Sequence, residues 1–94
     1  MSRTMLDNNL EIMRKRLAWR ATHRGIKEMD ILVGGFARAH LSKMSEPELL
    51  HFANLLELPD QDLLSWATHQ TTVPPEHQSE MLDAMLSFRP KGLR

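Results

Sequence analysis

The sequence predicts an all-α fold, a compact five-helix bundle in a single domain. Apolar residues recur at spacings of three and four, whereas the period-two alternation of strands is missing and tyrosine is absent. A chain of 94 residues with 41% hydrophobic and 26% charged residues is sufficient for one modest core. We expect this domain to cover residues 7–89, with flexible termini at 1–6 and 90–94.

The first two helices are expected at about 7–22 and 26–41, with Gly25 between them. A glycine just after a helix commonly adopts a left-handed conformation, which we expect for Gly25. The second helix contains Gly34-Gly35, which is costly in a helix and therefore predicts close approach of another backbone. This helix has the clearest apolar face, formed by Ile26, Met29, Leu32, Val33, Phe36, Ala37, His40 and Leu41.

Helix-start signals mark the second half of the chain. Ser45 and Glu48 have the spacing of a capping box, and Leu50 is expected to widen the buried face of the helix that follows. Pro75 follows an extended Thr- and Pro-rich connector, so it is taken as the start of the last helix. The remaining helices are expected at about 45–56, 59–69 and 75–88.

Composition and charge exclude several classes of protein. The chain has no cysteine, which excludes disulfides and thiolate chemistry. It has no apolar run long enough to cross a bilayer, so we expect a cytoplasmic protein without membrane insertion. Residues 1–45 carry nine Lys/Arg and four Asp/Glu, whereas 46–94 carry three and eight. This asymmetry fits either steering of a charged partner or attraction between the two halves of one bundle.

The sequence has no recognisable catalytic or cofactor motif. The histidines never recur at the three- or four-residue spacing that places two metal ligands on one helical face, and no phosphate-binding loop or serine elbow is present. We therefore expect no enzyme activity, no catalytic residue, no metal and no cofactor of its own. His40 is interpreted as a hydrogen-bonded core histidine. The five histidines are His23, His40, His51, His69 and His77.

The segment 24–30 combines a glycine turn with charges of both signs. Glu28 and Asp30 fall in the first turns of the second helix, where carboxylates are favourable. A basic band precedes the segment, and three of its arginines recur at intervals of four along one side of the first helix. The band consists of Arg14, Lys15, Arg16, Arg20 and Arg24, of which Arg16, Arg20 and Arg24 have this spacing. An ordinary helix corner with a solvated charged face explains these features as well, and a basic helix also occurs in small nucleic-acid-binding proteins, although the neutral chain argues against that role.

The pattern Arg24-Gly25-x-x-Glu28-x-Asp30 resembles the RGxxE signature of the SdhE (YgfY) family of succinate dehydrogenase assembly factors. The resemblance continues through residues 55–66 and the Pro-Pro pair before the last helix, and covers about 14–88. It implies a monomeric five-helix protein that binds the flavoprotein subunit of succinate dehydrogenase, and often of fumarate reductase, and promotes covalent attachment of FAD to that subunit.

The resemblance also implies which residues contact the partner. Arg24, Gly25 and Glu28 are the matched contact residues, and Asp30 supports them. The weaker candidates are Ile26, Lys27, Arg16 and Arg20. The helper would hold the flavoprotein's mobile parts in reacting geometry without a catalytic side chain of its own. The alternative hypotheses are a generic interaction module of the antitoxin type and a nucleic-acid-binding protein.

Overall fold

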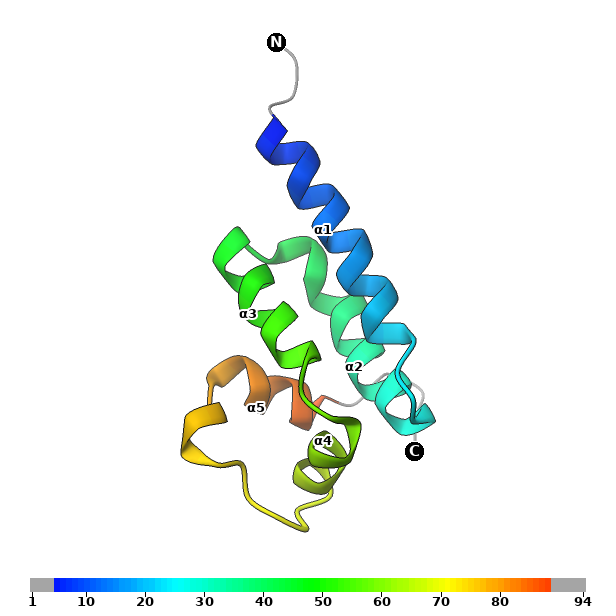
Figure 1. Cartoon of the computed structure of the whole chain (residues 1–94), viewed down its shortest axis with the longest axis vertical. Coiled ribbons are helices and arrows are strands. Elements are labelled where there is room, and N and C mark those ends of the chain that lie inside the picture. Colours follow the sequence, from blue (N-terminus) through cyan, green and yellow to red (C-terminus); the bar gives the residue numbers. More distant parts are fainter. Residues whose placement is uncertain (1–4, 89–94) are drawn as a thin grey trace.

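The computed structural model describes residues 5–88 and folds them into five α-helices and two 3-10 turns, with no strand in this range (Figure 1). The all-α prediction is therefore confirmed. Residues 1–4 and 89–94, on which most of the expected flexible termini fall, lie outside the described residues. The elements are α1 (Met5–Thr22), α2 (Lys27–His40), η1 (Leu41–Lys43), α3 (Glu46–Leu56), α4 (Asp60–Ala67), η2 (Pro75–His77) and α5 (Glu80–Ser87).

Helices α1 and α2 run side by side in opposite directions, and α3 packs beside them, while α4 and α5 close one end of the bundle (Figure 1). A Cβ atom added to Gly34 would lie 2.9 Å from Thr22 Cγ2 and 3.3 Å from the Ala21 carbonyl oxygen. The glycine pair was expected to mark a close approach of another backbone. That prediction is confirmed at Gly34, and the neighbour is α1.

The core takes side chains from all five α-helices, and each fully buried Leu, Val, Phe or Met contributes about 1.5 to 3 kcal/mol. Two expectations were wrong. Leu50 is half exposed on α3, and His40 is an exposed residue whose ring packs 4.6 Å from that of Phe36. Both residues lie at the margin of an apolar face, where periodicity alone does not show the width of the buried stripe. The largest fully buried side chains are Phe52, Met29, Leu49, Leu63, Leu82, Met85 and Val33.

Serine caps fix the starts of α3 and α5. The capping box at Ser45 is confirmed, because its hydroxyl accepts from the Glu48 amide at 3.4 Å and the Glu48 carboxylate accepts from the Ser45 amide at 2.8 Å. The predicted start of the last helix at Pro75 was wrong. Pro75 begins only a 3-10 turn, and α5 begins after Ser79, whose hydroxyl accepts from the Leu82 amide at 3.1 Å.

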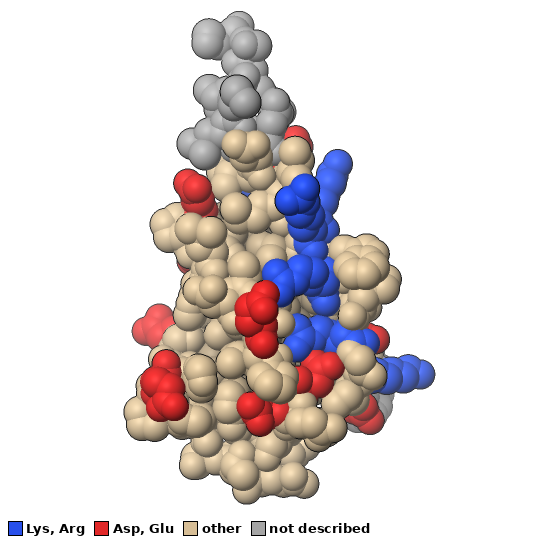
Figure 2. All heavy atoms as spheres, viewed as in Figure 1, with Lys and Arg blue, Asp and Glu red and all other residues tan. Residues whose placement is uncertain are grey.

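Charge is segregated in space as well as in sequence. Lys and Arg side chains gather over α1, whereas most acidic side chains on the same face lie toward the other helices (Figure 2). Part of this positive charge is used inside the bundle. Arg14 donates from Nε to the Leu41 carbonyl at 3.2 Å and from Nη2 to the Met44 carbonyl at 2.9 Å. Arg14 thereby binds the carbonyl groups of the C-cap residue of α2 and of the residue that follows η1.

Candidate functional site

The RGxxE segment lies where the connection between α1 and α2 meets the connection between α3 and α4 (Figure 1). We call residues 23–28 the motif corner. The side chains of the corner fall into two groups. Some are turned inward and hold the bundle together, and others are exposed along one edge. The division between them decides which residues are available to a partner.

Arg24 is turned inward. Its side chain is only 9% exposed, and Nε donates to Asp60 Oδ1 at 2.7 Å. The two terminal nitrogens donate to the carbonyls of Leu56 and Leu58, each at 2.8 Å. These carbonyls belong to the end of α3 and the residues after it, where helical carbonyls lack partners within the helix. The planar guanidinium thus ties the α1–α2 connection to the α3–α4 connection.

Two carboxylates complete this tie. Asp60, at the first position of α4, binds Arg24 through Oδ1 and accepts the backbone amide of Gly25 through Oδ2 at 2.9 Å. Asp30 accepts the backbone amide of Arg24. The backbone of the motif corner is therefore held from α2 and from α4. In this structure the Asp30 carboxylate binds the corner backbone, and the Arg24 guanidinium is occupied by groups within the bundle.

Gly25 is exposed at the tip of the motif corner. The expectation of a left-handed backbone was wrong, because its φ angle lies outside the positive range in which side chains are strained. An added Cβ would be 3.4 Å from Asp60 Oδ2, an ordinary contact distance. The fold therefore does not require glycine at this position, and its lack of a side chain matters for what can approach from outside.

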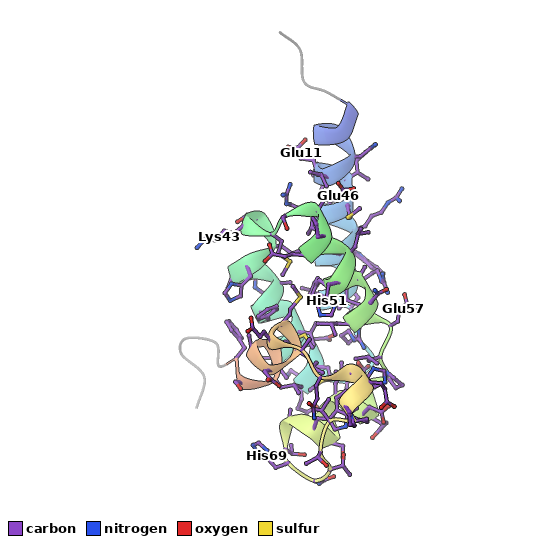
Figure 3. The ribbon with its side chains drawn as sticks, turned by 90° about the vertical axis from the view of Figure 1, so that its left-hand side faces the viewer. Glu11, Lys43, Glu46, His51, Glu57 and His69 are labelled. Carbon is purple, nitrogen blue, oxygen red and sulfur yellow. The ribbon has the colours of Figure 1, made fainter. Side chains whose placement is uncertain are left out.

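The exposed edge of the corner is formed by Lys27 and Glu28 in the first turn of α2, whereas Ile26 is half buried against the core. The basic band divides. Arg20 pairs with Glu57 at 2.6 Å. Glu57 is the residue at the end of α3 and is labelled in Figure 3. Arg16 is exposed one turn earlier on α1. The exposed candidates for partner contact are thus Gly25, Lys27, Glu28 and Arg16, with Arg20 in a surface ion pair.

Trp19 and His23 form an aromatic feature beside Gly25 that the sequence interpretation missed. Their rings stack with centroids 4.0 Å apart and planes 10° apart, and Trp19 is 62% exposed. His23 Nδ1 lies 2.7 Å from the Trp19 carbonyl oxygen, so Nδ1 carries the hydrogen and donates it. The available signal was the spacing of four, which places two rings together on a helix.

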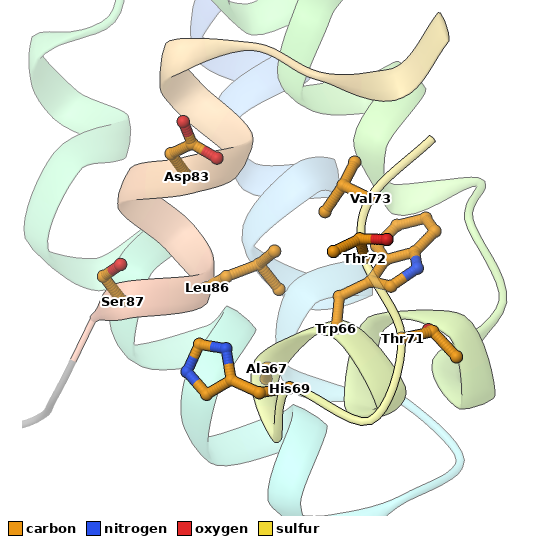
Figure 4. A pocket seen from close by; sticks show the side chains of 9 residues that line it. All are labelled: Trp66, Ala67, His69, Thr71, Thr72, Val73, Asp83, Leu86 and Ser87. Atoms are coloured by element: carbon orange, nitrogen blue, oxygen red, sulfur yellow. The ribbon is translucent and has the colours of Figure 1, made fainter. Parts of the chain in front are cut away.

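The surface has one hollow at the motif corner and another between α4 and α5. One of about 390 Å³ lies at the corner itself, between Trp19 and Glu57. Another of about 410 Å³ lies between α4 and α5, where Trp66 and Leu86 form an apolar floor beside His69 (Figure 4). Within residues 9–88 no group of three metal-ligating side chains comes together, so neither hollow has the donors of a metal site.

Residues 15–89 match the family model described as Sdh5, flavinator of succinate dehydrogenase. The chain belongs to the Sdh5 family. The matched interval includes the whole motif corner and every residue that binds Arg24. None of the helices that the structure describes in this Sdh5 family member has the length and hydropathy needed to cross a bilayer.

Similar proteins within the Sdh5 family come from bacteria and from mitochondria. The chain is 41% identical over 80 residues to "FAD assembly factor SdhE" of Acetobacter pasteurianus, covering 85% of this chain and 73% of that protein. It is 35% identical over 75 residues to "Succinate dehydrogenase assembly factor 2, mitochondrial" of Dictyostelium discoideum, covering 80% of this chain and 53% of that protein. The protein of the same name from Danio rerio is 37% identical over 81 residues (84% and 51%). The chain spans about half the length of these mitochondrial relatives. The family is one of assembly factors rather than enzymes.

Proposed function

We propose that this chain is an FAD assembly factor for succinate dehydrogenase, which binds the flavoprotein subunit and promotes covalent attachment of FAD to it. Membership of the Sdh5 family carries this proposal. The motif corner supports it, because the corner combines an exposed edge with a backbone held at several points. A rigid edge of this kind suits a helper whose role is positioning.

In this proposal, some residues at the corner contact the partner and others hold the backbone in place. Gly25, Lys27 and Glu28 contact the flavoprotein, since they are exposed. Arg24 and Asp60 act indirectly by fixing the backbone that presents these contacts. A partner surface approaches the bare backbone of Gly25 closely, and a long side chain there would hold the two proteins apart.

The helper contributes geometry rather than chemistry. FAD and the histidine that receives it belong to the flavoprotein, and a docked helper restricts the flavoprotein segments that otherwise move the two apart. Holding two reacting groups together lowers the barrier without any general acid or base from the helper. FAD remains the partner's cofactor in this scheme.

In-gel flavin fluorescence of the denatured flavoprotein tests the function, since only covalently attached FAD survives denaturation. Wild-type chain should raise the signal above that of flavoprotein with FAD alone. No increase would refute the proposed function. The same assay on fumarate reductase flavoprotein tests the second expected substrate.

Two variants with matched controls test the site. Gly25→Arg should reduce flavinylation, whereas Ala39→Arg, an exposed change near the end of α2 that is distant from the motif corner, should not. Glu28→Ala should weaken binding while costing the fold only about 0.3 to 1 kcal/mol, and Glu46→Ala, an exposed first-turn glutamate on α3, is its control. Normal flavinylation with Gly25→Arg would show that the site is elsewhere, even if the proposed function holds.

A further inference from the structure

Three large hydrophobic side chains are exposed among those that the structure describes, and all three border one seam between α1 and the α3 region. Their exposed fractions are 48% for Ile12, 62% for Trp19 and 51% for Leu50. One exposed apolar residue is common on a soluble protein, but several along one seam are typical of an interaction surface.

Along residues 9–20 of α1, this seam forms an apolar groove of about 470 Å³ between α1 and α3. Of the described residues that line it, the only charged ones are Arg16 and Arg20, and none is a carboxylate. The groove is therefore an apolar surface with a positive rim. Its other lining residues are Asn9, Ile12, Met13, Leu17, Leu50 and Ala53.

This groove continues into the motif corner. Arg20 lines both the groove and the corner hollow, and its ion pair with Glu57 crosses the seam between them. The Arg20 and Glu57 side chains are 38% and 72% exposed, and such surface pairs add little net stability. The pair can therefore open at small cost when a partner covers the seam.

We propose that the groove is a second docking site for the flavoprotein subunit and accepts a partner segment with aliphatic side chains and at least one carboxylate. This inference rests on the proposed function. The aliphatic side chains pack between Ile12 and Leu50, and the carboxylate pairs with Arg16. Arg20 lines both the groove and the corner hollow and so links the two contacts, and the exposed Trp19 lines the corner hollow beside it.

The charge of the groove favours this occupant over two others. Residues 89–94 include three Lys/Arg and no Asp or Glu, so their side chains are a poor match for a rim of arginines. A two-fold dimer formed over the groove would place two copies of a lining whose charged residues are all arginines against each other, which offers no charge complementarity. An acidic and apolar segment of a different protein has neither disadvantage.

Binding to purified apo-flavoprotein, measured by biolayer interferometry, tests the inference. Leu50→Glu and Ile12→Glu change the two walls of the groove, and both should weaken binding about tenfold or more. Ala39→Glu is the control, because it places the same side chain on an exposed part of α2 that lines neither hollow, and it should bind normally. Arg16→Glu should also weaken binding and reduce its dependence on salt.

The outcomes separate this inference from the proposed function. If wild type binds, Gly25→Arg does not, and both groove variants bind normally, the groove inference is wrong while the function stands. If wild type fails to bind the flavoprotein, the proposed function itself is wrong. Sedimentation of the chain alone gives a further test: a wild-type dimer that Leu50→Glu dissociates would assign the groove to a second copy and overturn the inference. Thermal melts of both groove variants establish that they are folded.

Discussion

Replacing Arg24 with alanine should destabilise the fold as well as impair docking. The change removes three hydrogen bonds to groups 32 to 36 residues away in the sequence. With the Arg24 side chain 9% exposed and that of Asp60 17% exposed, water restores these bonds only in part. Breaking a buried ion pair from one side costs about 3 to 5 kcal/mol. We expect about 3 kcal/mol, because Asp60 keeps its bond to the Gly25 amide.

Urea denaturation followed by circular dichroism at 222 nm measures this loss of unfolding free energy. In a thermal melt, the same loss should lower the melting temperature by roughly 12 to 24 °C for a domain of this size. Arg20→Ala is the matched control. It removes an arginine from an exposed pair and should cost at most about 1 kcal/mol. Arg24→Lys should recover less than half of the loss, because one ammonium cannot reproduce the planar fork. The reasoning is refuted if Arg24→Ala and Arg20→Ala destabilise the protein equally.

Three further substitutions probe other features by the same denaturation assay. Gly34→Ala should cost about 1 to 3 kcal/mol because its methyl group would crowd Thr22 and the Ala21 carbonyl, and an unchanged midpoint would show that α1 moves away easily. Gly25→Ala should leave stability unchanged or raise it by up to about 1 kcal/mol, and a clear loss would mean that the backbone there is strained after all. Ser79→Ala should cost about 1 kcal/mol through loss of the α5 cap, and no loss would remove Ser79 as the reason that α5 starts where it does.

Local signals predicted the helices well where a single short segment decides the outcome. The start of α3 follows from Ser45 and Glu48, which are three residues apart and bind each other. The start of α5 was misplaced because Pro75 is also a good first residue for a helix. The connector instead forms one 3-10 turn, and Ser79 supplies a side-chain cap that Pro75 cannot provide.

The candidate site was harder to predict, because its division into exposed and internal residues depends on contacts distant in sequence. The motif located the corner, but nothing near Arg24 in the sequence shows that its acceptors are Asp60 and the carbonyls at the end of α3. The exposure of Trp19 and Leu50 likewise depends on how α1 and α3 pack. Periodicity identifies an apolar face, whereas tertiary packing determines how much of it is covered.

The acceptors for the Arg24 side chain all come from residues 56–60, which has a consequence for how the protein is made. The stretch from α1 through α2 is synthesised first and contains the complete RGxxE segment, yet it lacks the groups that bind the Arg24 side chain. In a nascent chain, the Arg24 side chain can fix the motif corner only after α3 and the first residue of α4 have folded against it. If the motif corner binds the flavoprotein as proposed, the chain gains this ability only when its own fold is nearly complete.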